Sequence, residues 1–339
     1  MQSLLDDHQE KYGIITAEGV IIDGNRRASL LNRIRKDDSV DPMRKQHCEY
    51  FLAIVLPIDA DKKEILRLET TYQMGEDAKV DYNPIEKYLK CQDLQEAGFT
   101  LKEIARFMGD TETNVKMYLE VLQLMNEYLE NYGYTGMYTV LPSTNEDSFQ
   151  KLNGALKGYR AGNVSCMWDF DPEEDTTFLK LIAFDYIRAG YDQTDFRDII
   201  RKPTSKNPAA SFFGCKDIWE NFSERHFSQI EPITDAEESV ESILQNANPE
   251  DDVARLLRKR DKKWRDQTLG LITGNFKQSS EKLRNKQASD KPLELLQKAL
   301  DALSDIDTTQ QTFLQDPQIS ECIKEIGRIV WEYKKMLEK

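Results

Sequence analysis

The chain has 339 residues, of which 31% are charged and 39% are hydrophobic, and its formal net charge is −14. This length suits two or three domains, and the composition is that of a folded, helix-rich protein. The negative charge argues against a generic polyanion binder, and no apolar run approaches the roughly 18 residues that span a bilayer. The start has no cationic segment followed by a long apolar one, so we expect no secretory signal. Five cysteines and three histidines are scattered without a zinc or disulfide pattern, which indicates the reducing cytoplasm. Because no apolar run is long enough to span a bilayer, we expect no membrane partner.

Residues 1–83 are predicted to form a small α+β domain. In chain order we expect a helix over 3–12, strands over 14–16, 20–22 and 51–56, and helices over 26–36 and 62–74. The first two strands consist of β-branched residues around a turn that contains Gly19, which predicts a hairpin. Asp59 and Asp61 are suitable caps for the helix that follows them.

Residues 84–135 read as helical almost throughout. A short helix after Thr100, a turn at Gly109 and a second helix over 111–122 have the layout of a helix-turn-helix. Thr100 is expected to cap the first of these helices, with Glu103 completing a capping box. The segment predicts a helix-turn-helix domain.

Residues 136–250 carry most of the excess negative charge, with a net charge of −9. Their aromatic residues are numerous enough for a helical core, and we see no catalytic spacing. The acidic run over 169–175 could attract a cation, but carboxylates are also favourable at the start of a helix, here near Thr176. We expect the solvated helix start, and we expect His47, His226 and the lone cysteines to be structural.

Residues 251–339 carry a net charge of +3. Seven cations lie between Arg255 and Arg265, with only Asp261 interrupting them. Farther on, apolar residues recur every three or four positions in two stripes separated by Pro317. We expect a basic helix and then two helices, most simply an antiparallel hairpin or its extension into a coiled coil.

The segment over 20–30 carries the clearest chemistry. An apolar strand runs into Gly24 and then into a helix that opens with Arg26 and Arg27. Glycine permits a close backbone approach, a helix N-terminus favours anions, and a guanidinium matches phosphate oxygens. The pattern predicts a phosphate-binding turn. The alternative is a tight turn whose two arginines are solvated and pair with Asp23 or Glu18.

This segment, DGNRR, resembles the glycine–arginine box of the ParB/sulfiredoxin superfamily. Three later segments follow in that family's order: the strand and helix over 54–73, the DYNPIE linker over 81–86, and the helix-turn-helix beginning FTLKEIA at 99. The resemblance covers residues 1 to about 132. It implies a small ParB/sulfiredoxin-like α/β domain, then a helix-turn-helix segment, then a predominantly α-helical C-terminal region. The chain starts inside the family's pattern, which predicts either a short variant of the domain or a natural start upstream of Met1.

The resemblance implies a pocket for a nucleoside triphosphate, CTP or ATP, with magnesium. The family's first box maps onto Gly24, Asn25, Arg26 and Arg27. Its second box maps onto Glu69, which would hold the metal, and Gln73. Thr70 stands where the family has asparagine, and Gln73 stands where it has arginine. Glutamine cannot replace the bidentate phosphate contact of a guanidinium. The substitution therefore argues against hydrolysis of the nucleotide more than against its binding.

Two surfaces are candidates for binding DNA. The second helix of the helix-turn-helix offers Asn114 and Lys116, but residues 85–135 have a net charge of −4, which is a poor surface for phosphates. A purely structural role for this motif stays open. The better electrostatic candidate is the basic helix, whose alternative is a solvated face, with these cations: Arg258, Lys259, Arg260, Lys262 and Lys263.

The leading interpretation is a ParB-like protein whose nucleotide state controls protomer association and the binding of DNA or a partner protein. The resemblance also implies a homodimer formed through the C-terminal helices. The alternative is a non-catalytic DNA-binding or scaffolding subunit of a mobile-element or phage-defence system. A nuclease or kinase is a weaker hypothesis, because no nucleophile or metal cluster stands out.

Overall fold

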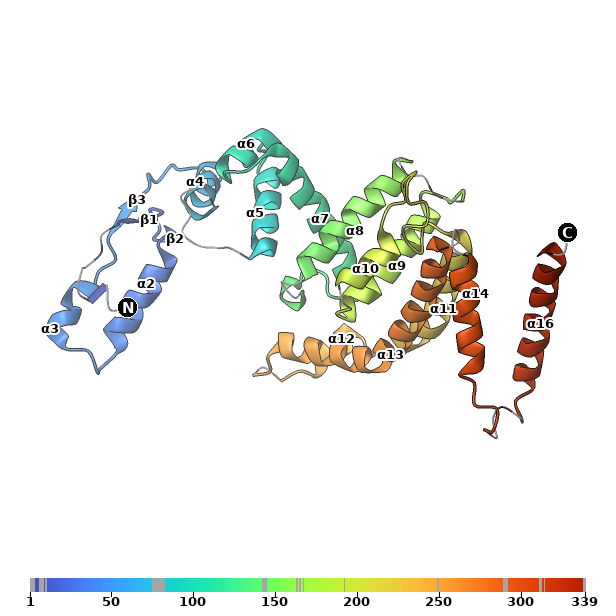
Figure 1. The fold of residues 1–339 in the computed structure, drawn as a ribbon. Coiled ribbons are helices and arrows are strands. Elements are labelled where there is room, and N and C mark those ends of the chain that lie inside the picture. The colour runs from blue at the N-terminus through green and yellow to red at the C-terminus, as the bar shows by residue number, and fades with distance from the viewer. Residues whose placement is uncertain are drawn as a thin grey trace. The chain divides into compact units, whose positions relative to one another are not determined.

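The computed structural model describes residues 4–5, 9, 11–74, 83–141, 145–162, 164, 166, 168–191, 193–248, 250–288, 292–310, 313 and 315–337. The described residues are mostly helical with one small sheet, so the chain belongs to the mainly helical α+β class (Figure 1). It forms two compact units, residues 1–277 and 278–339. None of the described helices combines the length and the apolar character needed to cross a membrane.

The sheet has three short strands in the order β2-β1-β3. Strands β1 (Gly13–Ile15) and β2 (Ile21–Asp23) are antiparallel, as the hairpin prediction requires, and β1 pairs in parallel with β3 (Ala53–Val55). The connection between β2 and β3 contains α2 (Asn25–Lys36), α3 (Pro42–Lys45) and a 3₁₀ turn, η1 (Gln46–Cys48). Leu31 and Ile34 of α2 are buried with Cys48, and these residues form the small core of this region.

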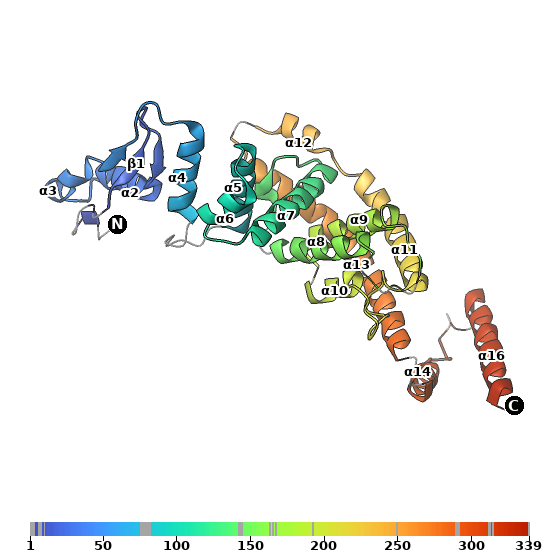
Figure 2. The ribbon, with the colours of Figure 1, turned by 90° about the horizontal axis from the view of Figure 1, so that it is seen from above.

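Helix α4 (Lys62–Met74) joins the sheet to the helices that follow. Its start is as predicted, because the Asp61 carboxylate accepts a hydrogen bond from the Glu64 amide at 2.6 Å. It contacts β2 on one side and α5 (Pro84–Glu96) and α6 (Leu101–Phe107) on the other, as Figures 1 and 2 show. The predicted helix over 3–12 lies largely outside the described residues.

The segment predicted as a helix-turn-helix forms two successive helices joined by a short turn, α6 and α7 (Glu112–Asn131). Thr100 and Glu103 form the predicted capping box, and Thr111 caps α7 by accepting from the Asn114 amide at 3.2 Å. A well-packed apolar core joins α5, α6 and α7; its buried members are Cys91, Leu94, Phe99, Ile104, Ala105, Met108 and Val115.

The rest of the first unit is a helical bundle with an aromatic core. Its elements are η2 (Tyr138–Val140), α8 (Glu146–Arg160), α9 (Glu174–Arg188), α10 (Gln193–Ile200), α11 (Lys216–Asp235), α12 (Val240–Asn246) and α13 (Val253–Gln287), whose residues 278–287 belong to the second unit. Phe212 is buried in contact with both Phe222 and Phe276, and so joins the connection between α10 and α11 to α11 and α13. Since α13 is anchored in this bundle, the predicted boundary at residue 250 is not a division between compact units.

The second unit contains α14 (Pro292–Ser304) and α16 (Pro317–Leu337), the two predicted C-terminal helices. Their apolar stripes do not pack against each other as the expected hairpin would require. Leu300 is 58% exposed and Val330 56% exposed, and α16 has no buried residue. Both helices therefore present unpartnered apolar faces within the described part of this unit.

Candidate functional site

The N-terminus of α2 is the candidate phosphate-binding turn. Gly24 follows β2 with φ 96° and ψ 13°, a left-handed conformation that glycine adopts at little cost. No side chain caps this end of the helix, and its first turn contains no acidic residue. The amide of Ala28 donates to the Gly24 carbonyl at 2.9 Å, so the amides before Ala28 have no partner within the helix. These amides and the positive end of the helix dipole favour an anion.

The two arginines of this turn lie differently. Arg26, like Asn25, is exposed. The Arg27 guanidinium lies over the Phe51 ring, 5.7 Å from its centroid, and donates to the Lys11 carbonyl. The Nε atom of Arg27 is buried and has no hydrogen-bond partner among the described residues. Arg27 thus ties α2 to the segment before β1, and Arg26 is the guanidinium that a ligand would meet.

The Phe51 ring also explains the glycines around it. A Cβ atom at Gly24 would lie 2.8 Å from Cζ of Phe51, and one at Gly13 would overlap the same ring. Gly24 therefore serves the packing of this ring as well as the left-handed turn.

The side chains of the second box are engaged within the fold. The Glu69 carboxylate forms an ion pair with Lys90 of α5, with 2.9 Å between Oε2 and Nζ. Thr70 is fully buried and donates to the Leu66 carbonyl of its own helix at 2.8 Å. The side chain of Gln73 lies outside the described part of the chain. Among the described residues, Glu69 forms no hydrogen bond or ion pair with the Gly24–Arg27 turn.

Asp110 organises the polar side of the helix-turn-helix. Its carboxylate accepts from Lys87 at 2.7 Å, Tyr118 at 2.7 Å and the Asn114 side-chain amide at 2.6 Å. Burial acts to raise the pKa of Asp110, but these hydrogen bonds outweigh it and hold that pKa well below its usual range. The Asn114 side-chain amide thus hydrogen-bonds within the turn and does not point its donor toward a base edge. Lys116 is exposed and borders an open groove of about 500 Å³ between α5 and α7.

The basic stretch of α13 divides into two sets. Arg258, Lys259, Lys262 and Lys263 are exposed. Arg260 differs from them, because its side chain is 12% exposed and its guanidinium pairs with Glu237 at 3.2 Å and donates to Tyr134 Oη at 2.7 Å. Arg260 therefore belongs to the interior of the bundle and is not part of the exposed cationic face predicted for this helix.

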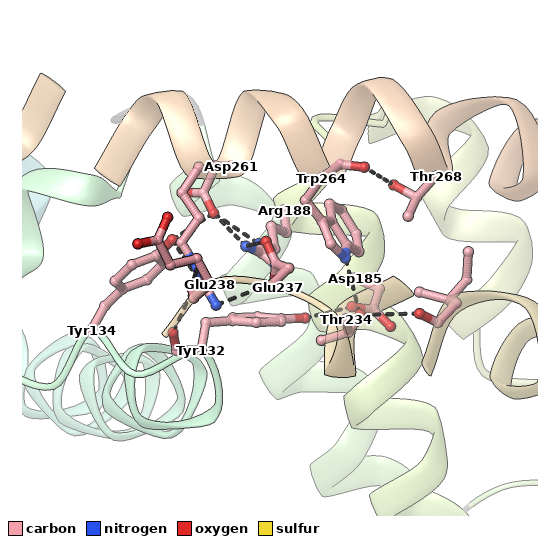
Figure 3. Close-up of polar contacts among 12 residues, drawn as sticks. Tyr132, Tyr134, Asp185, Arg188, Thr234, Glu237, Glu238, Asp261, Trp264 and Thr268 are labelled. Atoms are coloured by element: carbon pink, nitrogen blue, oxygen red, sulfur yellow. Dashed lines mark hydrogen bonds and ion pairs between the residues drawn. The ribbon is translucent and has the colours of Figure 1, made fainter. Parts of the chain in front are cut away.

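Arg260 borders a buried ionic cluster centred on Arg188, shown in Figure 3. The Arg188 side chain is fully buried, donates to both Glu237 oxygens at 2.8 Å, and pairs with Asp261 at 2.7 Å. Its guanidinium is sandwiched between the rings of Tyr132 and Trp264, 4.5 and 4.4 Å from their centroids. Burial acts to lower the pKa of Arg188, but the two carboxylates reverse this and raise it.

This cluster joins the end of α7, α9, the segment after α11, and α13. Tyr134 donates to Asp261 at 2.7 Å, and Trp264 donates to Thr234 at 3.0 Å. Sequence reasoning missed the cluster because its members are far apart in the chain. The local signal was Arg188 itself, a charge directly after the apolar run of α9 that ends at Ile187.

The remaining candidates have structural roles. His226 is buried, and its Nε2 lies 2.9 Å from Asp185 Oδ2. In the acidic run, Asp171 accepts from the amides of Glu174 and Glu173, and these bonds lower the pKa of its carboxyl group. The run is thus the predicted helix start, and no group of three or more metal-ligating side chains occurs among the residues that the structure describes.

No protein-family model matches this chain, and no curated protein is significantly similar to it.

Proposed function

We propose that this chain binds a nucleoside triphosphate through its phosphates at the N-terminus of α2, and that the bound state controls association with a second protomer. The observation that carries the proposal is the free, acid-free first turn of α2, where exposed Arg26 stands beside unpaired amides. A guanidinium and helix amides together provide charge-assisted donors for phosphate oxygens.

The residues fit a phosphate better than they fit a metal held by the protein. Glu69, the proposed magnesium ligand, is paired with Lys90, and among the described residues it belongs to no group of three or more metal-ligating side chains. Magnesium is therefore proposed as the counter-ion that accompanies the triphosphate. CTP and ATP are the two candidate ligands.

The C-terminal helices supply the surface for association. Large apolar side chains are exposed along one stripe of α14, and on α16 the exposed members of the corresponding stripe are Ile323, Val330, Tyr333 and Leu337. Trp331 and Met336 are also exposed, on either side of the α16 stripe. Soluble monomers rarely expose contiguous apolar surface of this extent, and such surfaces mark protein–protein contacts. We assign these faces to a second copy of the chain.

The test is calorimetric titration of the full chain with CTP, ATP and pyrophosphate, in the presence and absence of magnesium. Arg26→Ala should weaken triphosphate binding at least about tenfold, the loss expected for one charge-assisted contact of roughly 1.4 kcal/mol or more. Arg33→Ala is the matched control, because it removes an exposed arginine about 10 Å farther along the same helix. Absence of binding to the wild type, or equal losses in both variants, would refute the proposal.

A second function is favoured by the contacts that Glu69 and Thr70 of the second box make within the fold. Because Glu69 and Thr70 serve contacts within the fold, a non-catalytic DNA-binding or scaffolding role needs nothing further from them. DNA binding that is unchanged by any nucleotide, and unchanged in Arg26→Ala, would favour this role over the nucleotide-controlled one.

A further inference from the structure

One face of α13 presents five cations to solvent, which we call the basic face: Arg255, Arg258, Lys259, Lys262 and Lys263. Their spacing of three, four, seven and eight positions from Arg255 places all five on one side of a helix. The residues between them, Leu257, Arg260, Asp261 and Trp264, turn inward to the bundle. The cations of this stretch therefore form one surface on one side of α13, and they do not surround the helix.

The fold leaves this face largely without acidic partners. Among the residues that the structure describes, only Arg258 of the five has an ion-pair partner, Asp252, at the long distance of 3.8 Å. Asp261, the acid that interrupts the run, is held by Arg188 and Tyr134 on the opposite side of the helix. The interior cluster thus holds Asp261 away from the basic face and fixes the orientation of α13, and exposed Asp266 is the acid that shares the side of the five cations.

We propose that the basic face binds the phosphate backbone of duplex nucleic acid. From Arg255 to Lys263 the helix rises about 12 Å, and duplex DNA carries about seven negative charges over the same length of its axis. Five cations on one side of a helix match that charge density, and an α-helix fits the major groove. The match is one of charge and dimension, so it predicts backbone binding without base specificity.

A membrane surface fits this helix less well. Helices that lie on membranes insert an apolar face beside their cations. The apolar face of α13 is already buried in the bundle through Leu257, Trp264, Ile272 and Phe276. Binding to the phosphates of nucleic acid requires only the exposed cations of the basic face. It does not depend on nucleotide binding at α2.

The experiment is fluorescence anisotropy of the full chain with a labelled 20-base-pair duplex at 50 to 200 mM salt. The wild type should bind, and the logarithm of its binding constant should fall steeply and linearly with the logarithm of salt concentration. Replacing Lys259, Lys262 and Lys263 by glutamine should reduce that slope by about 2.7, at roughly 0.9 for each lost phosphate contact, and weaken binding at least tenfold at low salt.

The matched control replaces Lys277, Lys282 and Arg284 by glutamine, which removes three exposed cations farther along the same helix. It should leave binding within about twofold of the wild type. Equal losses in the two triple variants would overturn the proposal, since net charge alone would then explain them. Failure of the wild type to bind the duplex would also overturn the proposal. If the wild type instead self-associates in a salt-dependent way and the first triple variant does not, the basic face binds an acidic protein surface.

The variants also separate this inference from the proposed function. Arg26→Ala should retain the salt slope of the wild type, and the basic-face variant should retain triphosphate binding. Both triple variants alter exposed side chains, and the single reversal Lys262→Glu offers a smaller perturbation that should still lower the slope.

Discussion

The ammonium of Lys90 on α5 donates to the carboxylate of Glu69 on α4, with 2.9 Å between Nζ and Oε2. The Lys90 side chain is only 11% exposed, so the pair lies in the contact between the two helices. The carboxylate expected to contact a metal thus joins the sheet region to the helix-turn-helix. A nucleotide-bound magnesium ion would compete with Lys90 for the charge of the Glu69 carboxylate.

Lys90→Met should therefore release Glu69 while keeping an apolar stem in the helix contact. We expect a loss of about 1 kcal/mol in the free energy of unfolding, the size measured for partly exposed pairs. Triphosphate affinity in magnesium should rise if the freed carboxylate meets the ion. Urea unfolding and titration of Lys90→Met, Glu69→Gln and the double variant test this, and a coupling energy of zero would contradict the pairing.

Gly24→Ala should destabilise the fold more than Gly19→Ala. Both glycines have similar positive φ values, 96° and 88°, so both variants carry about 1–2 kcal/mol of backbone strain. Only at Gly24 would the new Cβ meet a neighbour, Phe51 at 2.8 Å, whereas nothing lies within 4 Å at Gly19. Unfolding of each variant, alone and with Phe51→Leu, separates strain from overlap. Equal losses at the two glycines would show that the ring is not packed on this turn.

Asp110 should make stability depend on acidic pH. Its folded-state pKa lies below the unfolded value of about 3.9, so its contribution is present above that pH and is lost as the pH falls toward the folded-state value. Asp110→Asn should cost about 2 kcal/mol at pH 7, the worth of hydrogen bonds to a charged group, and the gap to wild type should narrow below pH 4. Asp93→Asn, an exposed change on α5, is the control. A gap that stays constant from pH 7 to pH 3 would contradict the assignment.

The apolar faces of α14 and α16 should make the chain self-associate. Trp331 is 60% exposed, so its burial in a dimer should shift its fluorescence to shorter wavelength as protein concentration rises. Leu296→Glu with Leu300→Glu should weaken association in sedimentation velocity, whereas Lys324→Glu, a charged change on α16, should not. A wild type that stays monomeric at high micromolar concentration, with and without triphosphate, would exclude a second copy as the occupant.

The sequence predicts the parts of this fold that local chemistry decides. The turn at Gly19 and the capping box of Thr100 and Glu103 act within a few residues, and each occurs where the pattern indicates. Pairing of β1 with β3 is non-local, and the apolar run at 51–56 indicates a strand without naming its neighbour. The contact between the Phe51 ring and Gly24 is also non-local, so the sequence does not predict it. The sequence assigns Gly24 to the approach of a ligand, whereas the structure shows that this glycine also makes room for the ring.

In the candidate binding surfaces too, the sequence predicts which residues are present but not which of them are exposed. Arg26 and Arg27 are adjacent in the sequence and equivalent in the DGNRR pattern, yet only the structure shows that Arg27 is tied to Lys11 and Phe51. The basic stretch is visible in the sequence, but Arg260 turns inward because Leu257 and Trp264 set the buried side of α13. Locating that side requires the positions of α9 and the segment after α11.

The last prediction concerns the cluster that fixes this side of α13. Arg188→Met removes the cation shared by Glu237 and Asp261, and breaking a buried ion pair in this way costs about 3–5 kcal/mol. Glu237 would keep Arg260 as a partner at 3.2 Å, whereas the one partner left to Asp261 among the described residues would be the Tyr134 hydroxyl. Asp261→Asn should therefore restore more stability to Arg188→Met than Glu237→Gln does. Urea unfolding measures this order, with exposed Arg197→Met as the control. If Glu237→Gln restored more, the shared contact with Arg260 would not operate, and Glu237 rather than Asp261 would be the carboxylate that depends on Arg188.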